Sequence, residues 1–137
     1  MYNKILVPMA LDHDISPQTL AIAKALGGAD CEITALHVHE EVPGTARAYL
    51  DASVMQAGLD RAQALLSEKV AGLAHVTPVL VSGHSARTII DYANSNAIDC
   101  IVMGSHKPDL SDYFLGSTAA RVVRHAGCAV HVHRRAE

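Results

Sequence analysis

The chain has 137 residues, of which 50% are hydrophobic and 18% charged, and its formal net charge is −3 with histidine neutral. This length and composition predict one globular domain over residues 1–137 and exclude a disordered chain. Because there is no basic excess, the usual electrostatic footprint of a nucleic-acid-binding protein is absent, and we expect no nucleic-acid partner.

The first part of the chain alternates strand and helix signals. Residues 5–8 form a short apolar run, as expected of a strand covered on both faces. Ser16 before Pro17 predicts a helix start, and Gly27-Gly28 predicts its end. Residues 31–39 predict a second strand, and the E-E-V-P-G segment after them a loop.

The second part continues the alternation. A long helix is predicted over about residues 52–73, because apolar side chains recur there at helical spacing. Residues 76–81 predict a strand at a sheet edge, since they contain Pro78. Residues 83–85 open a further helix. The remaining elements are a strand over 98–103, a helix over 118–125 and a last strand over 128–133.

This order predicts an α/β fold, a three-layer doubly wound parallel sheet with helices on both faces. Parallel neighbours need a crossover connection, and a helix between successive strands supplies it.

The segment from Gly104 to Thr118, G-S-H-K-P-D-L-S-D-Y-F-L-G-S-T, is the candidate ligand-binding element. Ligands bind open parallel sheets outside the carboxyl ends of the strands, and Gly104 stands at such an end. Gly116 and Ser117 open the next helix, whose first amides favour an anion. Lys107 adds a positive charge. The same pattern is typical of an ordinary turn and helix cap, and both interpretations stay open.

The whole chain resembles the universal stress proteins. The resemblance rests on K-I-L-V-P at the start, L-H-V in the second strand, I-D-C-I-V-M-G-S-H, and L-G-S-T-A-A-R-V-V-R-H-A-G-C-A-V-H-V-H at the close. It implies a five-stranded sheet of order 3-2-1-4-5, in the adenine nucleotide alpha hydrolase-like or flavodoxin-like arrangement. S-H-K-P-D is similar to a variant loop of a short-chain branch of that family, in which it implies nucleotide binding.

The loop departs from the family's G-x2-G-x9-G-[ST] pattern at defined positions. Gly104 and Gly116-Ser117 fit the outer positions, whereas Lys107 replaces the middle glycine and the spacer is one residue short. Ala10 stands where the family usually has an aspartate for the ribose, and Asp12 is the candidate substitute.

The resemblance implies a site for ATP, or for AMP or ADP, with Mg²⁺ as an accompanying ion. Carried over by position, its binding residues are Pro8, Met9, Ala10, Val38, Met103, Gly104, Ser105, His106, Lys107, Gly116, Ser117 and Thr118. The first three would line the adenosine side, and the loop residues would take the phosphates. For the two methionines, plain core packing is the favoured alternative.

The remaining polar residues suggest little chemistry. Two H-x-H pairs, His37 with His39 and His131 with His133, lie on strands that the expected order separates, so we expect no metal site. Asp109 and Asp112 could bind Mg²⁺ beside a triphosphate or be solvated. No general base or Ser-His-Asp arrangement is evident, so we expect no catalytic residues.

The sequence therefore predicts an adenine-nucleotide-binding stress-response protein that acts as an oligomeric regulatory or protective module on unknown protein partners. The apolar last strand, from Cys128 to His133, predicts a homodimer, with a tetramer as a further level of assembly. Two alternatives stay open: a slow Mg-dependent ATPase that uses Lys107 and Ser117, and a nucleotide-free interaction scaffold.

Three scattered cysteines favour a reducing, cytoplasmic setting, because two of them lie in apolar runs where a thiol behaves as a small hydrophobic side chain. No signal-peptide layout is evident, and no apolar stretch approaches the roughly 20 residues that span a bilayer. We expect a soluble protein without a membrane partner.

Overall fold

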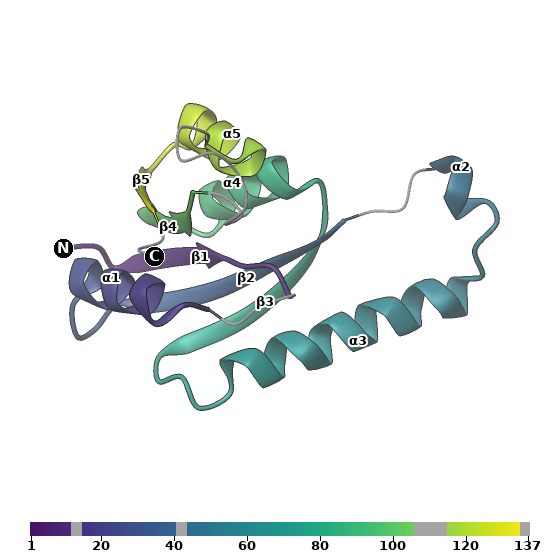
Figure 1. Ribbon diagram of the computed structural model, residues 1–137, viewed down its shortest axis with the longest axis horizontal. Helices are drawn as coiled ribbons and strands as arrows, with labels where there is room; N and C mark the ends of the chain where they lie inside the picture. Colours follow the sequence, from purple (N-terminus) through teal and green to yellow (C-terminus); the bar gives the residue numbers. More distant parts are fainter. Residues whose placement is uncertain (12–14, 41–43, 106–114, 135–137) are drawn as a thin grey trace.

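Five parallel strands form the central sheet in the order β3-β2-β1-β4-β5 (Figure 1). The computed structural model describes residues 1–11, 15–40, 44–105 and 115–134. The strands are β1 (Lys4–Pro8), β2 (Glu32–Glu40), β3 (Val76–Gly83), β4 (Cys100–Gly104) and β5 (Ala129–His133). The helices are α1 (Pro17–Gly27), α2 (Gly44–Arg47), α3 (Ala52–Val70), α4 (Ser85–Ser95) and α5 (Ser117–His125). The expected strand order and parallel arrangement are confirmed.

The sheet separates two apolar clusters, which makes the fold three-layered. Successive side chains of a strand point to opposite faces, so Ile5 and Val7 of β1 join one cluster while Leu6 joins the other. The first cluster includes Ala23 of α1 and Leu66 of α3. Residues of α4 and α5 pack in the second cluster, so helices cover both faces of the sheet.

The first helix begins and ends where the sequence predicts. The Ser16 side chain accepts a hydrogen bond from the Thr19 amide at 3.0 Å, and Pro17 occupies the first turn. Gly28 caps the carboxyl end with φ 79°, a left-handed conformation that glycine adopts without steric cost.

Several predicted boundaries require correction. The fourth strand begins at Cys100 instead of residue 98, because the Ile98 amide still donates to the Ala93 carbonyl of α4 at 3.0 Å. The Asp99 carboxylate before the strand accepts the amides of Asn3 and Lys4 at 2.8 and 3.0 Å. Gly83 ends β3 and does not open α4. The predicted E-E-V-P-G loop does not extend through Gly44, which begins the short helix α2; residues 41–43 lie outside the described ranges.

The structure confirms Pro78 on an edge strand, since β3 lies at one end of the sheet. Within the described ranges, no helix is both long and apolar enough to cross a membrane.

Candidate functional site

The candidate site lies where β1 and β4 run side by side in the middle of the sheet. The chain moves outward from β1 to β2 and β3, and then returns to place β4 on the other side of β1. Paired positions between β1 and β4 stop at Leu6 and Ile101, although the strands continue to Pro8 and Gly104. Such a reversal of strand order is where open parallel sheets bind ligands.

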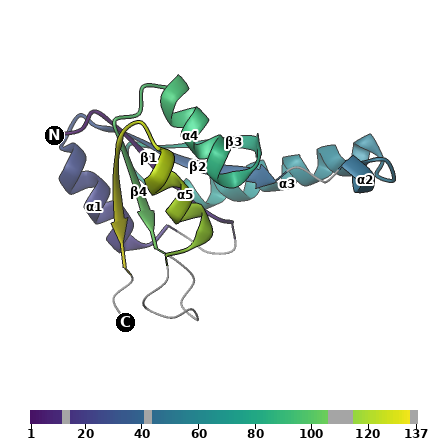
Figure 2. The same ribbon diagram turned by 90° about the horizontal axis from the view of Figure 1, so that it is seen from above.

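Backbone hydrogen bonds join the start of α5 to the ends of β4 and β5. The Gly116 amide donates to the Ser105 carbonyl at 2.7 Å, and the Ser105 amide donates to the His133 carbonyl at 3.1 Å. In Figure 2 the end of β4 lies beside the first turn of α5. Ser105 and Gly116, which lie near the two ends of the predicted Gly104–Thr118 element, are therefore direct neighbours.

The first turn of α5 supplies backbone donors at this point. Its first intrahelical bond runs from the Ala120 amide to the Gly116 carbonyl at 2.8 Å, so the amides of Ser117 and Thr118 precede it. Gly116 is the N-cap residue and has no side chain to cap them. Ser117 is exposed and Thr118 half-exposed, so their hydroxyls lie at the surface.

Gly104 leaves open space at the end of β4. Among the described residues, no atom outside its immediate chain neighbours lies within 4 Å of a Cβ atom built on it. Gly104 is exposed, whereas the adjacent Ser105 is buried. The backbone of β4 is thus accessible at Gly104 and at no earlier strand residue, since residues 100–103 are buried.

The predicted binding residues that precede Gly104 divide into buried and accessible ones. Met9 and Met103 are buried, each in one of the two core clusters, and Val38 is buried in the same cluster as Met103. Pro8 is half-buried and Ala10 exposed at the end of β1. The methionines therefore pack as the core alternative expects, while the chain beyond β1 reaches the surface.

Five predicted residues lie outside the described ranges. They are Asp12, His106, Lys107, Asp109 and Asp112. The predictions made for them remain predictions.

His133 makes a contact in this region that the sequence, where it is half of an H-x-H pair, does not reveal. Its Nε2 atom lies 2.7 Å from the Thr19 hydroxyl, and that hydroxyl lies 2.8 Å from the Ser16 hydroxyl. Its Nδ1 atom is buried without a hydrogen-bond partner among the described residues. Burial lowers the pKa of His133, and neighbouring His131 lowers it further. His133 thus ties β5 to α1 in its neutral form.

His37 has a structural contact at the end of β1. Its Nδ1 donates to the Met9 carbonyl at 2.9 Å, and the Met9 amide donates to the Leu36 carbonyl at 2.9 Å. The two H-x-H pairs lie on β2 and β5, which β1 and β4 separate. In the described part of the chain no group of three or more histidine, cysteine or acidic side chains could hold a metal ion.

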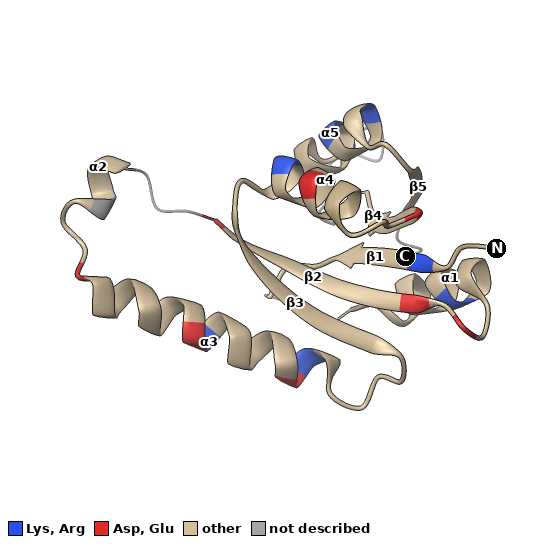
Figure 3. Ribbon diagram, turned by 180° about the vertical axis from the view of Figure 1, so that it is seen from behind, with Lys and Arg blue, Asp and Glu red and all other residues tan. Residues whose placement is uncertain are grey.

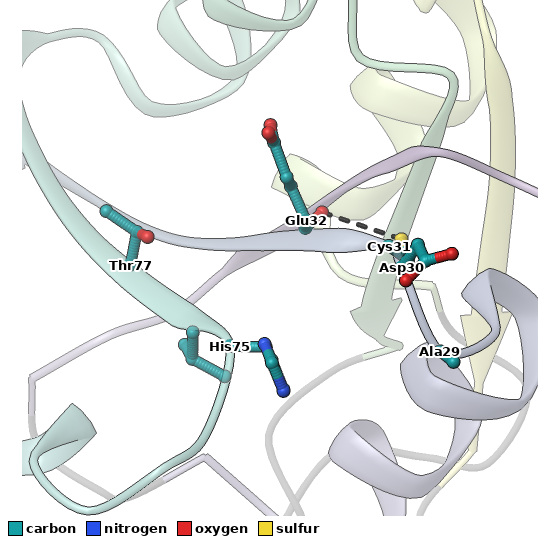
Figure 4. Close-up of a pocket in the computed structure, with 7 residues that line it drawn as sticks. Ala29, Asp30, Cys31, Glu32, His75 and Thr77 are labelled. Atoms are coloured by element: carbon teal, nitrogen blue, oxygen red, sulfur yellow. Dashed lines mark hydrogen bonds between the residues drawn. The ribbon is translucent and has the colours of Figure 1, made fainter.

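A separate depression of about 540 Å³ lies at the amino ends of β2 and β3 (Figure 4). Cys31, Glu32 and His75 contribute to its lining. The Cys31 thiol donates to the Glu32 carbonyl at 3.6 Å, and burial raises its pKa, so the thiol stays protonated and is a poor nucleophile. This end of the sheet is opposite to the one where ligands bind such folds.

The other two thiols are similarly unreactive. Burial raises the pKa of Cys128 and raises that of Cys100 to about 11. All three cysteines are free, and Cys31 and Cys100 are buried, in line with the prediction that two of the three behave as small hydrophobic side chains.

Comparisons with known proteins agree with this fold. Residues 1–134 match the Universal stress protein family. A universal stress protein from Methanothermobacter thermautotrophicus is 28% identical, with 98% of this chain and 97% of that protein covered. The solved structure of the hypothetical protein MJ0577 is 26% identical with a TM-score of 0.79, and covers 100% of this chain and 99% of its own.

Two solved structures carry nucleotides. A universal stress protein in complex with cAMP is 20% identical with a TM-score of 0.60, covering 98% of both chains. A family protein from Arabidopsis thaliana with AMP bound is 18% identical with a TM-score of 0.59, covering 98% of this chain and 92% of its own. At these identities the likeness concerns the fold.

Proposed function

This chain belongs to the universal stress protein family, and on that premise we propose that it binds an adenine nucleotide, ATP in the first instance, at the carboxyl ends of β1 and β4. Occupancy of this site would set the state of an oligomeric module that regulates or protects other proteins under stress. Two observations support this function: the contact between the loop ends, and the nucleotides bound to structural neighbours.

The observation that carries the proposal is the 2.7 Å hydrogen bond from the Gly116 amide to the Ser105 carbonyl. It holds the first turn of α5 against the end of β4, where Gly104 leaves open space. Free amides of a first helical turn and the positive end of the helix dipole favour a phosphate group. The hydroxyls of Ser117 and Thr118 are additional donors beside those amides.

An adenosine moiety would lie on the β1 side of the same edge. Pro8 and Ala10 are accessible there, and by the family resemblance the backbone of Val38 would contact the adenine. The neighbours with cAMP and AMP bound support an adenine ligand. Since both ligands carry a single phosphate, the preference for ATP rests on the loop chemistry, in particular the charge of Lys107.

Isothermal titration calorimetry with ATP tests the site through Gly104→Ala. The added methyl group meets no atom of the described residues, so we expect the variant to fold normally. If phosphate approaches the backbone there, the methyl group blocks it and Kd should rise about tenfold or more. Gly44→Ala is the matched control, because it also adds a methyl group into open space but lies in α2, and its Kd should equal that of the wild type.

The choice between nucleotides is tested by comparing ATP, AMP and cAMP with and without Mg²⁺. Lys107→Ala should weaken ATP more than AMP if the ammonium group meets the terminal phosphates. Equal weakening would contradict that role. No binding of any adenine nucleotide to the wild type would support the scaffold alternative, and phosphate release at a measurable rate would support the slow hydrolase.

We also propose that the protein forms a homodimer through β5. This strand is at a sheet edge with β4 as its neighbour, and Val130 and Val132 on it are half-buried. An unpaired edge of this kind favours pairing with a second chain. The three free thiols support a reducing, cytoplasmic setting for the assembly.

A further inference from the structure

A long helical segment extends from the body of the protein without a core of its own. Residues 44–61, which we call the arm, comprise α2, its connection to α3 and the first half of α3. Figures 1 and 2 both show the arm reaching beyond the strands, away from α4 and α5. Where side-chain burial is described, no residue of the arm is buried, and Ala62 is the first buried residue of α3.

The arm does not have the composition of a helix that stands alone in water. Helical segments shorter than about 12–15 residues are marginal without tertiary contacts, and glycine and β-branched residues weaken them further. The arm contains Gly58 and Val54 inside α3, and between residues 48 and 59 only Asp51 is charged. In Figure 3 this part of the ribbon is accordingly almost free of charged positions. A covering partner would supply the missing stabilisation.

The exposed apolar side chains are concentrated in the same segment. Tyr49 is 91% exposed, Val54 58% and Leu50 39%. These three lie within six residues of one another, whereas the other exposed large apolar side chains among the described residues, Met1, Leu115 and Val123, stand singly. Clustered exposure of this kind marks an interaction surface.

One face of the arm is complementary to itself. Asp51, Val54, Gly58 and Arg61 follow one another at spacings of three and four, so they form one stripe along the helix. The stripe begins with an acid and ends with a base, with an apolar side chain and a glycine between them. It lies about 100° around the helix from Ala62, Leu66 and Val70, the buried face of α3.

We propose that the arm binds the arm of a second copy of this chain, with the two α3 helices antiparallel about a two-fold axis. In that register Val54 of each copy packs on Gly58 of the other, and Asp51 of each lies beside Arg61 of the other. No atom of the described chain outside the helix itself lies within 4 Å of a Cβ atom built on Gly58, so the space that Val54 would fill is open among these residues. A glycine at this point also lets two helices approach closely.

The charged ends of the stripe are available for this pairing. Asp51 accepts the Ser53 amide through Oδ1 at 3.0 Å, which leaves Oδ2 for a second partner. Arg61 is exposed, and the ion pairs between described residues do not include it. Two such pairs across a two-fold axis would fix the antiparallel register, because a parallel arrangement would place like charges opposite each other.

The arm is also distant from the other expected interface. The arm includes the first half of α3. This helix packs on the side of β3, whereas β5 is at the opposite edge of the sheet. Both contacts can therefore be made at once, and together they join more than two copies. A helix pair of this length buries less area than a standard stable interface, so association through the arm should depend on concentration.

Sedimentation velocity of the full chain over about a hundredfold range of concentration tests the proposal. The average mass of the wild-type species should increase as the protein concentration rises. Arg61→Glu and Asp51→Lys should each abolish this gain, because each places like charges together at both ends of the pair. An equimolar mixture of the two variants should recover it, since every contact between unlike copies is again complementary.

Controls separate pairing from folding and from net charge. Asp60→Lys changes the net charge as Asp51→Lys does. Asp60 accepts a hydrogen bond from Gln56 and lies outside the stripe, so the Asp60→Lys variant should associate as the wild type does. Gly58→Gln strengthens the helix yet fills the space needed by Val54, and it should abolish association while circular dichroism keeps its helix signal. A wild type of constant mass, or a mixture that fails to recover association, overturns the proposal.

Discussion

The two ends of the parallel strands are built differently. At the amino ends, the Asp99 carboxylate accepts two amides of the chain entering β1, and Gly27 fits against Cys31 and Ile5 without room for another atom. At the carboxyl ends, no atom of the residues that the structure describes crowds a Cβ atom built on Gly104. The entry to β1 is thus closed by packing and hydrogen bonds, with the depression of Figure 4 further along the same end at β2 and β3, whereas the end of β4 keeps accessible backbone. The difference indicates which end contributes stability and which is free to bind a ligand.

The largest expected effect comes from Gly27→Ala. A Cβ atom at Gly27 would overlap the Cβ and Sγ atoms of Cys31, which are held close to the backbone and cannot move aside cheaply. We expect the free energy of unfolding to fall by about 2–3 kcal/mol, despite the better helix propensity of alanine. Urea unfolding followed by circular dichroism measures it.

The same substitution at the open end is the control for this experiment. Gly104→Ala should change the free energy of unfolding by less than about 0.5 kcal/mol. Equal losses from Gly27→Ala and Gly104→Ala would show that the two ends do not differ in packing.

A smaller effect is expected from Asp99→Ala. The substitution leaves the Asn3 and Lys4 amides without their carboxylate partner, which should cost about 1–2 kcal/mol of unfolding free energy. Asp91→Ala is the matched control, because Asp91 is exposed and its side chain lies 4.0 Å from Arg87 in an i,i+4 pair. Surface pairs of that kind contribute little. Urea midpoints of the two variants should therefore differ clearly.

Much of this architecture was predictable because it depends on local patterns. Short apolar runs predicted most of the strands, a longer mixed segment over residues 31–39 predicted the second one, and Pro78 predicted an edge strand because proline has no amide hydrogen to donate to a neighbouring strand. Ser16 and Pro17 predicted the start of α1 through the orphan amides of a first turn. Each of these signals is complete within a few adjacent residues.

The contacts that close or open the sheet ends were not predictable in the same way. Asp99 meets Asn3 and Lys4 across more than ninety residues of sequence, and no local pattern distinguishes it from a solvated acid. The helical periodicity of α3 predicted its existence but not that its first half would lie beyond the sheet. What covers a helix depends on the lengths of the neighbouring strands, which single-sequence patterns define poorly.

The smallest expected effect tests whether the carboxyl end contains a pH-sensitive contact. Burial lowers the pKa of His133 in the folded protein, so the unfolded chain binds a proton first as pH falls. The contribution of His133 to stability is therefore complete above its unfolded pKa, near 6.5, and is lost as pH falls through the lower folded value.

His133→Gln should lose less stability than the wild type between pH 7.5 and 5.5, an interval that extends about one unit on either side of 6.5. Urea unfolding of both proteins at the two pH values measures the difference, in which the contributions of the other histidines cancel. Equal losses in the two proteins would mean that the buried ring, held 2.7 Å from the Thr19 hydroxyl, does not titrate differently in the folded state.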